Sequence, residues 1–122
     1  IIKKYLKPGE VFIDVGANVG YLSAVGAGLV GKTGQVHSFE PVPRYFDYVQ
    51  RTAKFIYSLG PKNHVEYEVD NIHTNLPTTN VNVITLDDLL KSRKEVNKID
   101  FIKVDVEGYE YDFLLGARET IE

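Results

Sequence analysis

The stretch that most constrains the fold is Val11-Phe-Ile-Asp-Val-Gly-Ala-Asn-Val-Gly20, an apolar run that leads through an acid into closely spaced small residues. Its first residues are β-branched or aromatic without polar alternation, which predicts a strand buried on both faces of a parallel sheet. Asp14 falls at the carboxyl end of that strand, where open α/β sheets bind ligands. Gly16, Asn18 and Gly20 can adopt positive φ angles and so allow a sharp turn close to a ligand. The pattern predicts a cradle for a nucleotide-type ligand.

Strand and helix patterns alternate along the whole chain. We expect strands at residues 11–15, 35–39, 64–69, 81–85 and 100–106, and helices at 19–30, 86–91, between the prolines near 41–43 and 60–61, and after residue 108. Apolar positions at helical spacing predict the buried side chains of two helices. They are Phe46, Val49, Ala53 and Ile56 in the helix between the prolines, and Phe113, Leu114, Ala117 and Ile121 in the helix after residue 108. This order predicts an α/β fold with a doubly wound, mostly parallel sheet and flanking helices.

Size and charge narrow the class of protein. The chain has 122 residues, which fits a single domain over residues 1–122, and a net charge of −3. It lacks a basic footprint, so nucleic acid is not an expected partner. No apolar run in the sequence is long enough to span a bilayer, and no membrane partner is expected. With no cysteine in the sequence, disulfides and thiolate chemistry are excluded, and a cytoplasmic location is the expectation.

Two further glycine-containing strings are alternative candidates for the nucleotide-binding loop. Gly26–Gly31 is a literal G-x-G-x-x-G, and Gly26–Thr33 is a literal phosphate-loop string. Both motifs need a helix directly after them, but Gly34 and a strand pattern follow here. We interpret the stretch as a small-residue helix packed close to the sheet. A nucleoside-triphosphate-binding protein that uses Lys32 and Thr33 remains an alternative, with the strand that ends at Asp105 as its partner.

Spacing and charge favour an adenosine ligand other than a dinucleotide. In Asp14-x-Gly16-x-Asn18-x-Gly20 the small residues follow one another at intervals of two. The dinucleotide fingerprint instead needs an interval of three between its last two glycines. Asp14 would repel a pyrophosphate but would suit a ligand that carries an ammonium and a sulfonium group. Glu40 closes the neighbouring strand and can accept the hydroxyl groups of a ribose. These features point to S-adenosylmethionine.

Four motifs in order make a family resemblance specific: Asp14-Val-Gly-Ala-Asn-Val-Gly20, Ser38-Phe-Glu-Pro41, Ile84-Thr-Leu-Asp-Asp-Leu89 and Asp100-Phe-Ile-Lys-Val-Asp-Val-Glu-Gly-Tyr-Glu110. Together they resemble the FkbM-type methyltransferases. The resemblance implies a class I, Rossmann-like fold, S-adenosylmethionine as cofactor, and methyl transfer to a hydroxyl of a sugar or natural product. The acceptor would be a small molecule or glycan. The match implies these cofactor-binding residues: Asp14, Gly16, Ala17, Asn18, Gly20, Glu40 and Pro41.

The carboxylates near the last strand are the remaining candidates for chemistry. Asp105 ends that strand on the ligand side and could take a proton from a substrate hydroxyl or help to bind a metal. Alternatively, Asp105, Glu107 and Glu110 stabilise the start of the next helix. We favour that role for the last two and leave Asp105 open between the two roles. No metal site is proposed, because the three histidines have no ligand spacing with each other or with the acids.

The resemblance also indicates what the chain lacks. Later strands of the seven-stranded sheet would follow Glu122, so we expect a sheet truncated at its C-terminal end. The strand at 100–106 would then be an open edge through which the chain could self-associate. Asp70 is a weak candidate for the adenine contact, because only residues 59–84 fill a segment that is longer in the family. The short chain leaves a non-catalytic cofactor-binding module as a further alternative.

Overall fold

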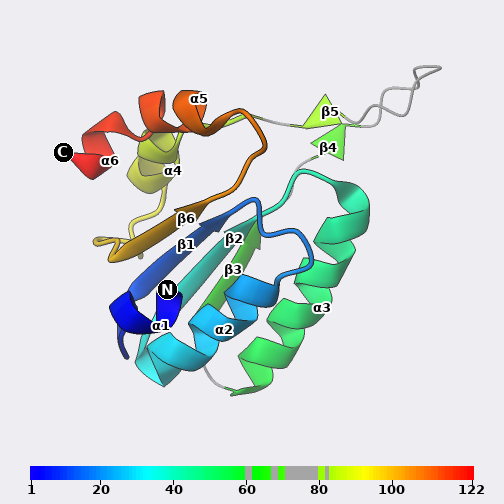
Figure 1. Ribbon diagram of the computed structural model, residues 1–122, viewed down its shortest axis with the longest axis vertical. Helices are drawn as coiled ribbons and strands as arrows, with labels where there is room; N and C mark the ends of the chain where they lie inside the picture. The colour runs from blue at the N-terminus through cyan, green and yellow to red at the C-terminus, as the bar shows by residue number, and fades with distance from the viewer. Residues whose placement is uncertain (60–61, 67–68, 71–79, 82) are drawn as a thin grey trace.

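A parallel sheet forms the centre of the molecule. The computed structural model describes residues 1–59, 62–66, 69–70, 80–81 and 83–122, with side chains for 1–54 and 83–122. Its four-stranded sheet has the order β3-β2-β1-β6, and all three pairings are parallel (Figure 1). The strands are β1 (Val11–Val15), β2 (Gln35–Phe39), β3 (Lys62–Glu66) and β6 (Phe101–Val104). The predicted α/β, doubly wound, Rossmann-like class is confirmed.

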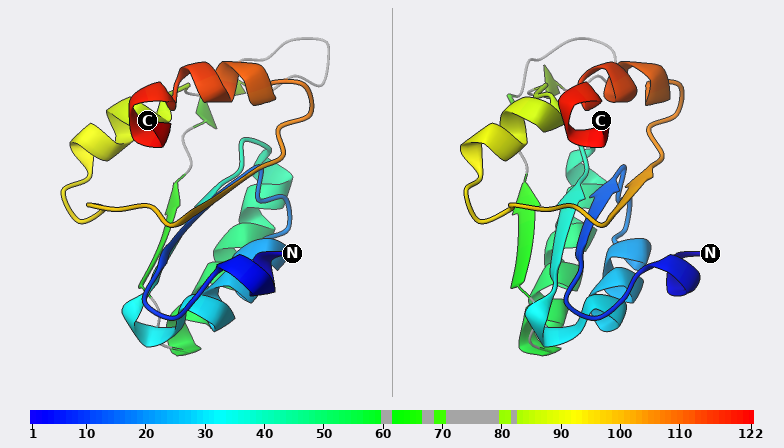
Figure 2. Two further views of the ribbon diagram at one scale, coloured as in Figure 1. Left: turned by 60° about the vertical axis from the view of Figure 1, so that its left-hand side comes forward. Right: turned by 90° about the vertical axis from the view of Figure 1, so that its left-hand side faces the viewer.

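Helices lie on both sides of this sheet, as Figure 2 shows. They are α1 (Ile2–Tyr5), α2 (Tyr21–Val30), α3 (Pro43–Leu59), α4 (Leu86–Ser92), α5 (Glu110–Leu115) and α6 (Arg118–Ile121), with a 3-10 turn η1 (Gly31–Thr33) after α2. A small antiparallel pair, β4 (Val69–Asp70) and β5 (Asn80–Val81), lies apart from the main sheet. Among the residues described, no helix is long and apolar enough to cross a membrane.

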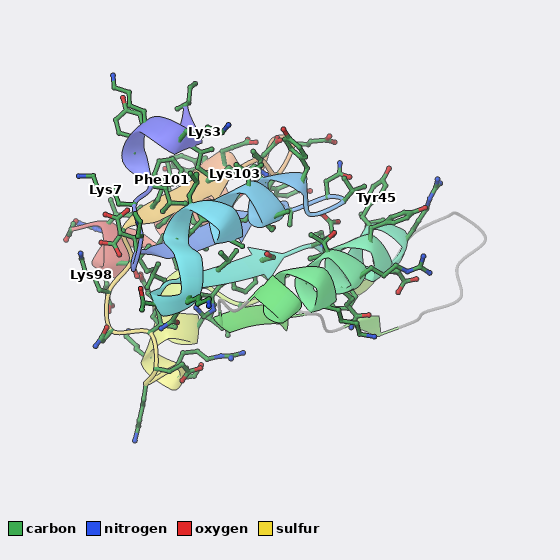
Figure 3. All side chains as sticks on the ribbon, turned by 90° about the horizontal axis from the view of Figure 1, so that it is seen from below. Lys3, Lys7, Tyr45, Lys98, Phe101 and Lys103 are labelled. Carbon is green, nitrogen blue, oxygen red and sulfur yellow. The ribbon has the colours of Figure 1, made fainter. Side chains whose placement is uncertain are left out.

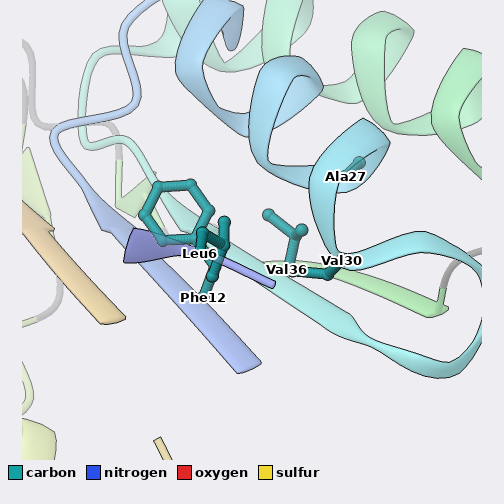
Figure 4. Packing of buried hydrophobic residues seen from close by; sticks show 5 residues of the cluster. All are labelled: Leu6, Phe12, Ala27, Val30 and Val36. Carbon is teal, nitrogen blue, oxygen red and sulfur yellow. The ribbon is translucent and has the colours of Figure 1, made fainter. Parts of the chain in front are cut away.

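The sheet is buried on both faces, as expected for parallel strands. On the side of α1 and α2, Phe12 is fully buried at the centre of a cluster (Figure 4) with Leu6, Ala27, Val30 and Val36. On the opposite face, Val11 and Ile13 pack against Val96. Because neighbours along a strand point to opposite faces, the apolar run at 11–13 supplies both layers. This explains why the run has no polar alternation.

The segment before α4 differs from the prediction. The strand expected at 81–85 is wrong at its end, because β5 covers Asn80–Val81 while residues 83–85 are not in a strand. Thr85 is instead the N-cap of α4, and its Oγ1 accepts a hydrogen bond of 3.1 Å from the N–H of Asp88. Thr85 and Asp88, three residues apart, therefore mark the start of the predicted helix at 86–91.

The C-terminal helix is also interrupted. The carbonyl of Gly116 accepts a hydrogen bond of 3.0 Å from the N–H of Asp87. This bond takes the place of the one that the carbonyl would accept within a continuous helix. Helices α5 and α6 are separated there, so a single apolar stripe does not continue along both. Ala117 is fully buried as predicted, whereas Leu114 and Ile121 are more than half exposed. The prediction that these two side chains belong to the buried face is wrong for this structure.

Asp87 connects α4 to α6. Its Oδ1 accepts hydrogen bonds of 2.9 Å and 2.6 Å from the N–H and hydroxyl of Thr120, and its Oδ2 accepts one of 3.0 Å from the N–H of Glu119. The Thr120 side chain is the main reason that the pKa of Asp87 is lowered below its usual value, with the two backbone N–H groups adding to it. The carboxylate therefore holds the first turn of α6 in place.

Replacing Asp87 by asparagine should make the melting temperature of the protein less dependent on pH in the acidic range. A carboxyl with a lowered folded-state pKa stabilises the fold above its unfolded pKa, and that stability is lost as pH falls through the folded value. We expect Asp87→Asn to lower the melting temperature at pH 7, and the two proteins to converge as the pH falls below the lowered folded-state pKa of Asp87, where both side chains are neutral. Thermal melts across this range measure the difference. Asp88→Asn, an exposed neighbour, is the control and should shift the melting temperature less.

Candidate functional site

The loop between β1 and α2 has the geometry that its sequence predicts. The φ angles of Gly16, Asn18 and Gly20 are 76°, 53° and 81°, so alternate residues lie in the left-handed region. The N–H groups of Gly16 and Ala17 each donate a 2.9 Å hydrogen bond to the carbonyl of Phe39. The loop is therefore attached to the carboxyl end of β2, and Gly20 forms the N-cap of α2.

Glu40 joins this loop to the segment after β2. Its side chain is buried, its Oε2 accepts a 2.7 Å hydrogen bond from the N–H of Asn18, and its Oε1 accepts a 2.8 Å bond from that of Val42. A carboxylate has about four acceptor positions, so two remain for ligand hydroxyl groups. Pro41 beside it is exposed, and Ala17 in the loop is buried.

Asp14 lies beneath the loop in a buried polar network. The residue is 0% exposed, and its Oδ2 accepts a 2.6 Å hydrogen bond from the hydroxyl of Ser23 on α2. Ser38 on β2 donates in turn to Ser23 at 2.8 Å. The other oxygen, Oδ1, lies 3.1 Å from Nζ of Lys103 on β6. A buried charge is tolerated when it is paired in this way.

The register of the sheet brings these residues together. Asp14 is the direct partner of Ser38 on one side and of Lys103 on the other. In-register residues of neighbouring strands point to the same face, which here is the face covered by α2. Sequence reasoning missed Ser23, Ser38 and Lys103. A lysine within an apolar, buried strand was the available signal, because such a lysine needs a partner.

Lys103 also contacts the loop itself. Its Nζ donates hydrogen bonds of 2.6 Å to the carbonyl of Gly16 and 3.4 Å to that of Val15. Its side chain is only 19% exposed. Figure 3 places Lys103 well apart from Lys7 and Lys98, which lie toward one end of the molecule. The ammonium group thus connects β6 to the glycine loop of β1.

Asp105 lies directly beside the same loop. Its N–H donates a 3.0 Å hydrogen bond to the carbonyl of Val15, and its own carbonyl packs against Gly16. The Asp105 side chain is exposed. The predicted proton acceptor is therefore next to the predicted cofactor loop, although it follows it by about ninety residues in the sequence.

The turn after Asp105 is closed by Glu110. The carboxylate accepts hydrogen bonds from the N–H groups of Gly108 at 3.0 Å and Val106 at 3.3 Å. The pKa of Glu110 is lowered, first by its own N–H and then by those two. The structure thus assigns Glu110 the role of stabilising the helix start. Glu107 in this turn is exposed and has a positive φ of 45°.

The competing glycine strings do not form a phosphate site. Gly26 and Gly28 lie within α2, and Gly26 packs against the ring of Phe12. Lys32 and Thr33 belong to η1, from which the chain enters β2 without a helix. The alternative of a phosphate-loop protein that uses Gly26–Thr33 is therefore wrong, because Lys32 follows the C-terminal end of a helix, where carbonyls and not N–H groups are free.

The other candidate positions contribute less. Asp70 belongs to β4, but its side chain lies outside the described residues. Within the part of the chain that is described, no group of three or more histidine, aspartate or glutamate side chains is placed to hold a metal ion. The organised site consists of the glycine loop, Glu40, the Asp14 network and the turn at Asp105.

A parallel sheet with a glycine-rich turn after its first strand and an acid closing the next defines a Rossmann-like nucleotide-binding protein. A family model described as the methyltransferase FkbM domain matches residues 14–122. The chain therefore belongs to the FkbM methyltransferase family, and the predicted family is confirmed. This membership supports S-adenosylmethionine as the cofactor.

One solved structure supports the fold, and a second shows a partial likeness. A SAM-dependent methyltransferase from Aquifex aeolicus matches with a TM-score of 0.52 and 18% identity over 98% of this chain and 58% of its own. A candidate rRNA methylase from Clostridium thermocellum matches with a TM-score of 0.48 and 23% identity over 53% of this chain and 36% of its own. This chain thus spans less than two thirds of the length of either protein. No curated protein matches the sequence.

Proposed function

We propose that this chain is the cofactor-binding part of an S-adenosylmethionine-dependent O-methyltransferase. The observation that carries the proposal is the hydrogen bond of 2.7 Å from the N–H of Asn18 to Glu40. It holds the glycine loop and the acid after β2 together at the carboxyl ends of two adjacent strands, where such folds bind nucleotides. Family membership over most of the chain supports the same assignment.

Each candidate residue has a role in this proposal. S-adenosylmethionine supplies an electrophilic methyl group. Glu40 accepts the ribose hydroxyl groups with the acceptor positions that its two backbone hydrogen bonds leave open. The loop from Gly16 to Gly20 holds the amino-acid end, with Ala17 and Asn18 between the turning residues, and Asp14 supports this loop from below. Pro41 borders the nucleoside.

Asp105 is the proposed catalytic residue. Its exposed carboxylate follows β6 and lies beside the loop, so an acceptor hydroxyl bound there could transfer its proton to it. The remaining catalysis would come from holding the acceptor oxygen in line with the methyl group. The proposed acceptor is a hydroxyl of a small molecule or glycan, in keeping with the family resemblance.

Calorimetric titration with S-adenosylmethionine and, separately, with magnesium ATP tests the cofactor. We expect binding of the first only. Glu40→Gln keeps the size of the side chain but removes its charge, and should weaken binding by about 10- to 100-fold, the scale of a hydrogen bond to a charged group. Lys32→Ala, an exposed residue beyond the C-terminal end of α2, is the matched control and should leave binding unchanged. Binding of ATP that Lys32→Ala removes would overturn the proposal.

Turnover separates an enzyme from a non-catalytic cofactor-binding module. Formation of S-adenosylhomocysteine with a panel of hydroxyl acceptors is the measurement, and Asp105→Asn should reduce it while leaving cofactor affinity intact. Cofactor binding without product for any acceptor, in a protein with its full sheet, would favour the binding module.

A further inference from the structure

The ammonium group of Lys103 occupies a cage of oxygen atoms under the glycine loop. It donates hydrogen bonds to the carbonyls of Gly16 at 2.6 Å and Val15 at 3.4 Å, and it lies 3.1 Å from Oδ1 of Asp14 as an ion pair. A lysine ammonium has three N–H donors, and two of them are used by carbonyls of the loop. In this position the charge of Lys103 faces Asp14, and its hydrogen bonds hold the loop.

The same contacts decide what Asp14 can do. Its Oδ2 is taken by the hydroxyl of Ser23, its Oδ1 faces Lys103, and the residue is 0% exposed. A ligand cannot reach either oxygen unless this network opens. The positive charge that the sequence suggests for the partner of Asp14 is thus supplied by the protein itself.

We infer that Lys103 is a positioning residue for the amino-acid end of the cofactor, an inference that rests on the proposed function. By fixing the carbonyls of Val15 and Gly16, Lys103 sets the direction in which the rest of the loop presents its polar groups. Asp14 acts on the cofactor through Lys103 and this loop and makes no direct contact with it. Recognition of the ribose through Glu40, on the other side of the loop, is independent of Lys103.

This division of roles predicts a selective loss. S-adenosylhomocysteine carries the amino-acid end, whereas 5′-methylthioadenosine has the same nucleoside without it. Lys103→Met keeps the length of the apolar stem but removes the charge. We expect this variant to reduce the preference for S-adenosylhomocysteine over 5′-methylthioadenosine by about tenfold or more, the scale of a lost charge-assisted hydrogen bond. A general weakening of the fold would lower both affinities together.

Calorimetric titration of both ligands into the wild-type chain and the variants tests the inference. The Asp14→Asn, Lys103→Met double variant has no unpaired buried charge and serves if the single variant does not fold. The same selective loss is expected there, and Lys103→Arg should retain most of the preference. An unchanged ratio in the double variant would overturn the role of Lys103 while leaving the proposed function intact. Failure of the wild type to bind S-adenosylhomocysteine would overturn the proposed function instead.

Discussion

Gly16→Ala is expected to unfold much of the chain and to abolish cofactor binding. A methyl group on Gly16 would overlap the backbone carbonyl of Asp105, which cannot rotate away as a side chain could. The φ of 76° adds a penalty of about 1–2 kcal/mol for any L-residue with a side chain. Overpacking adds about 1–3 kcal/mol more, so the sum of about 2–5 kcal/mol is a large part of the stability of a small domain.

Chemical denaturation and calorimetric titration with S-adenosylmethionine measure these effects. Two other glycines separate the causes. Gly9 shares the positive φ, at 86°, but a methyl group there would make only ordinary contact with Thr33, so Gly9→Ala reports the backbone penalty alone. Gly28 lies in α2 with open space around it, and Gly28→Ala should stabilise by up to about 1 kcal/mol through helix propensity. A Gly16→Ala protein as stable as Gly9→Ala would contradict the packing argument.

Asp14→Ala is the second large effect. It removes the partner of Lys103 and leaves an ammonium group that is mostly buried without its counter-charge. Breaking a buried pair from one side destabilises by about 3–5 kcal/mol. We also expect cofactor binding to be lost, because the carbonyls of Val15 and Gly16 lose the group that holds them. Denaturation and titration with S-adenosylmethionine measure the two losses.

Two variants test the origin of this effect. Asp14→Asn keeps an oxygen for the hydroxyl of Ser23 and should destabilise less than Asp14→Ala. Removing both charges in Asp14→Ala, Lys103→Met should recover part of the stability lost in the single variant, since replacing a whole buried pair is tolerated better than breaking it. If the double variant is less stable than Asp14→Ala, the unpaired charge is not the cause.

The sequence alone was sufficient to predict β1, the glycine loop after it and the order of the elements around them. Hydrophobic period and turn residues are local signals, so β1, β2 and the positive φ angles at alternate positions of the loop could be predicted. Rejecting the phosphate-loop string also needed only local context, because a strand pattern after Lys32 leaves no helix to hold phosphates.

The Asp14 network was not predictable to the same degree. Its members are far apart in sequence, and only the pairing of β6 with β1 places Lys103 next to Asp14. The break after α5 has a similar cause, because the N–H of Asp87, from a distant helix, takes the carbonyl of Gly116. The exposure of Leu114 and Ile121 follows from that break and could not be read from helical spacing.

The row formed by Ser38, Asp14 and Lys103 has a consequence for how the strands find their alignment. Strands rich in valine, isoleucine and phenylalanine can slide past one another with little change in apolar contact. A slip of one residue moves every side chain to the opposite face. Here such a slip would carry a carboxylate or an ammonium group into an apolar layer without its partner. The ion pair therefore selects a single alignment of β1 and β6 and penalises misfolded alternatives.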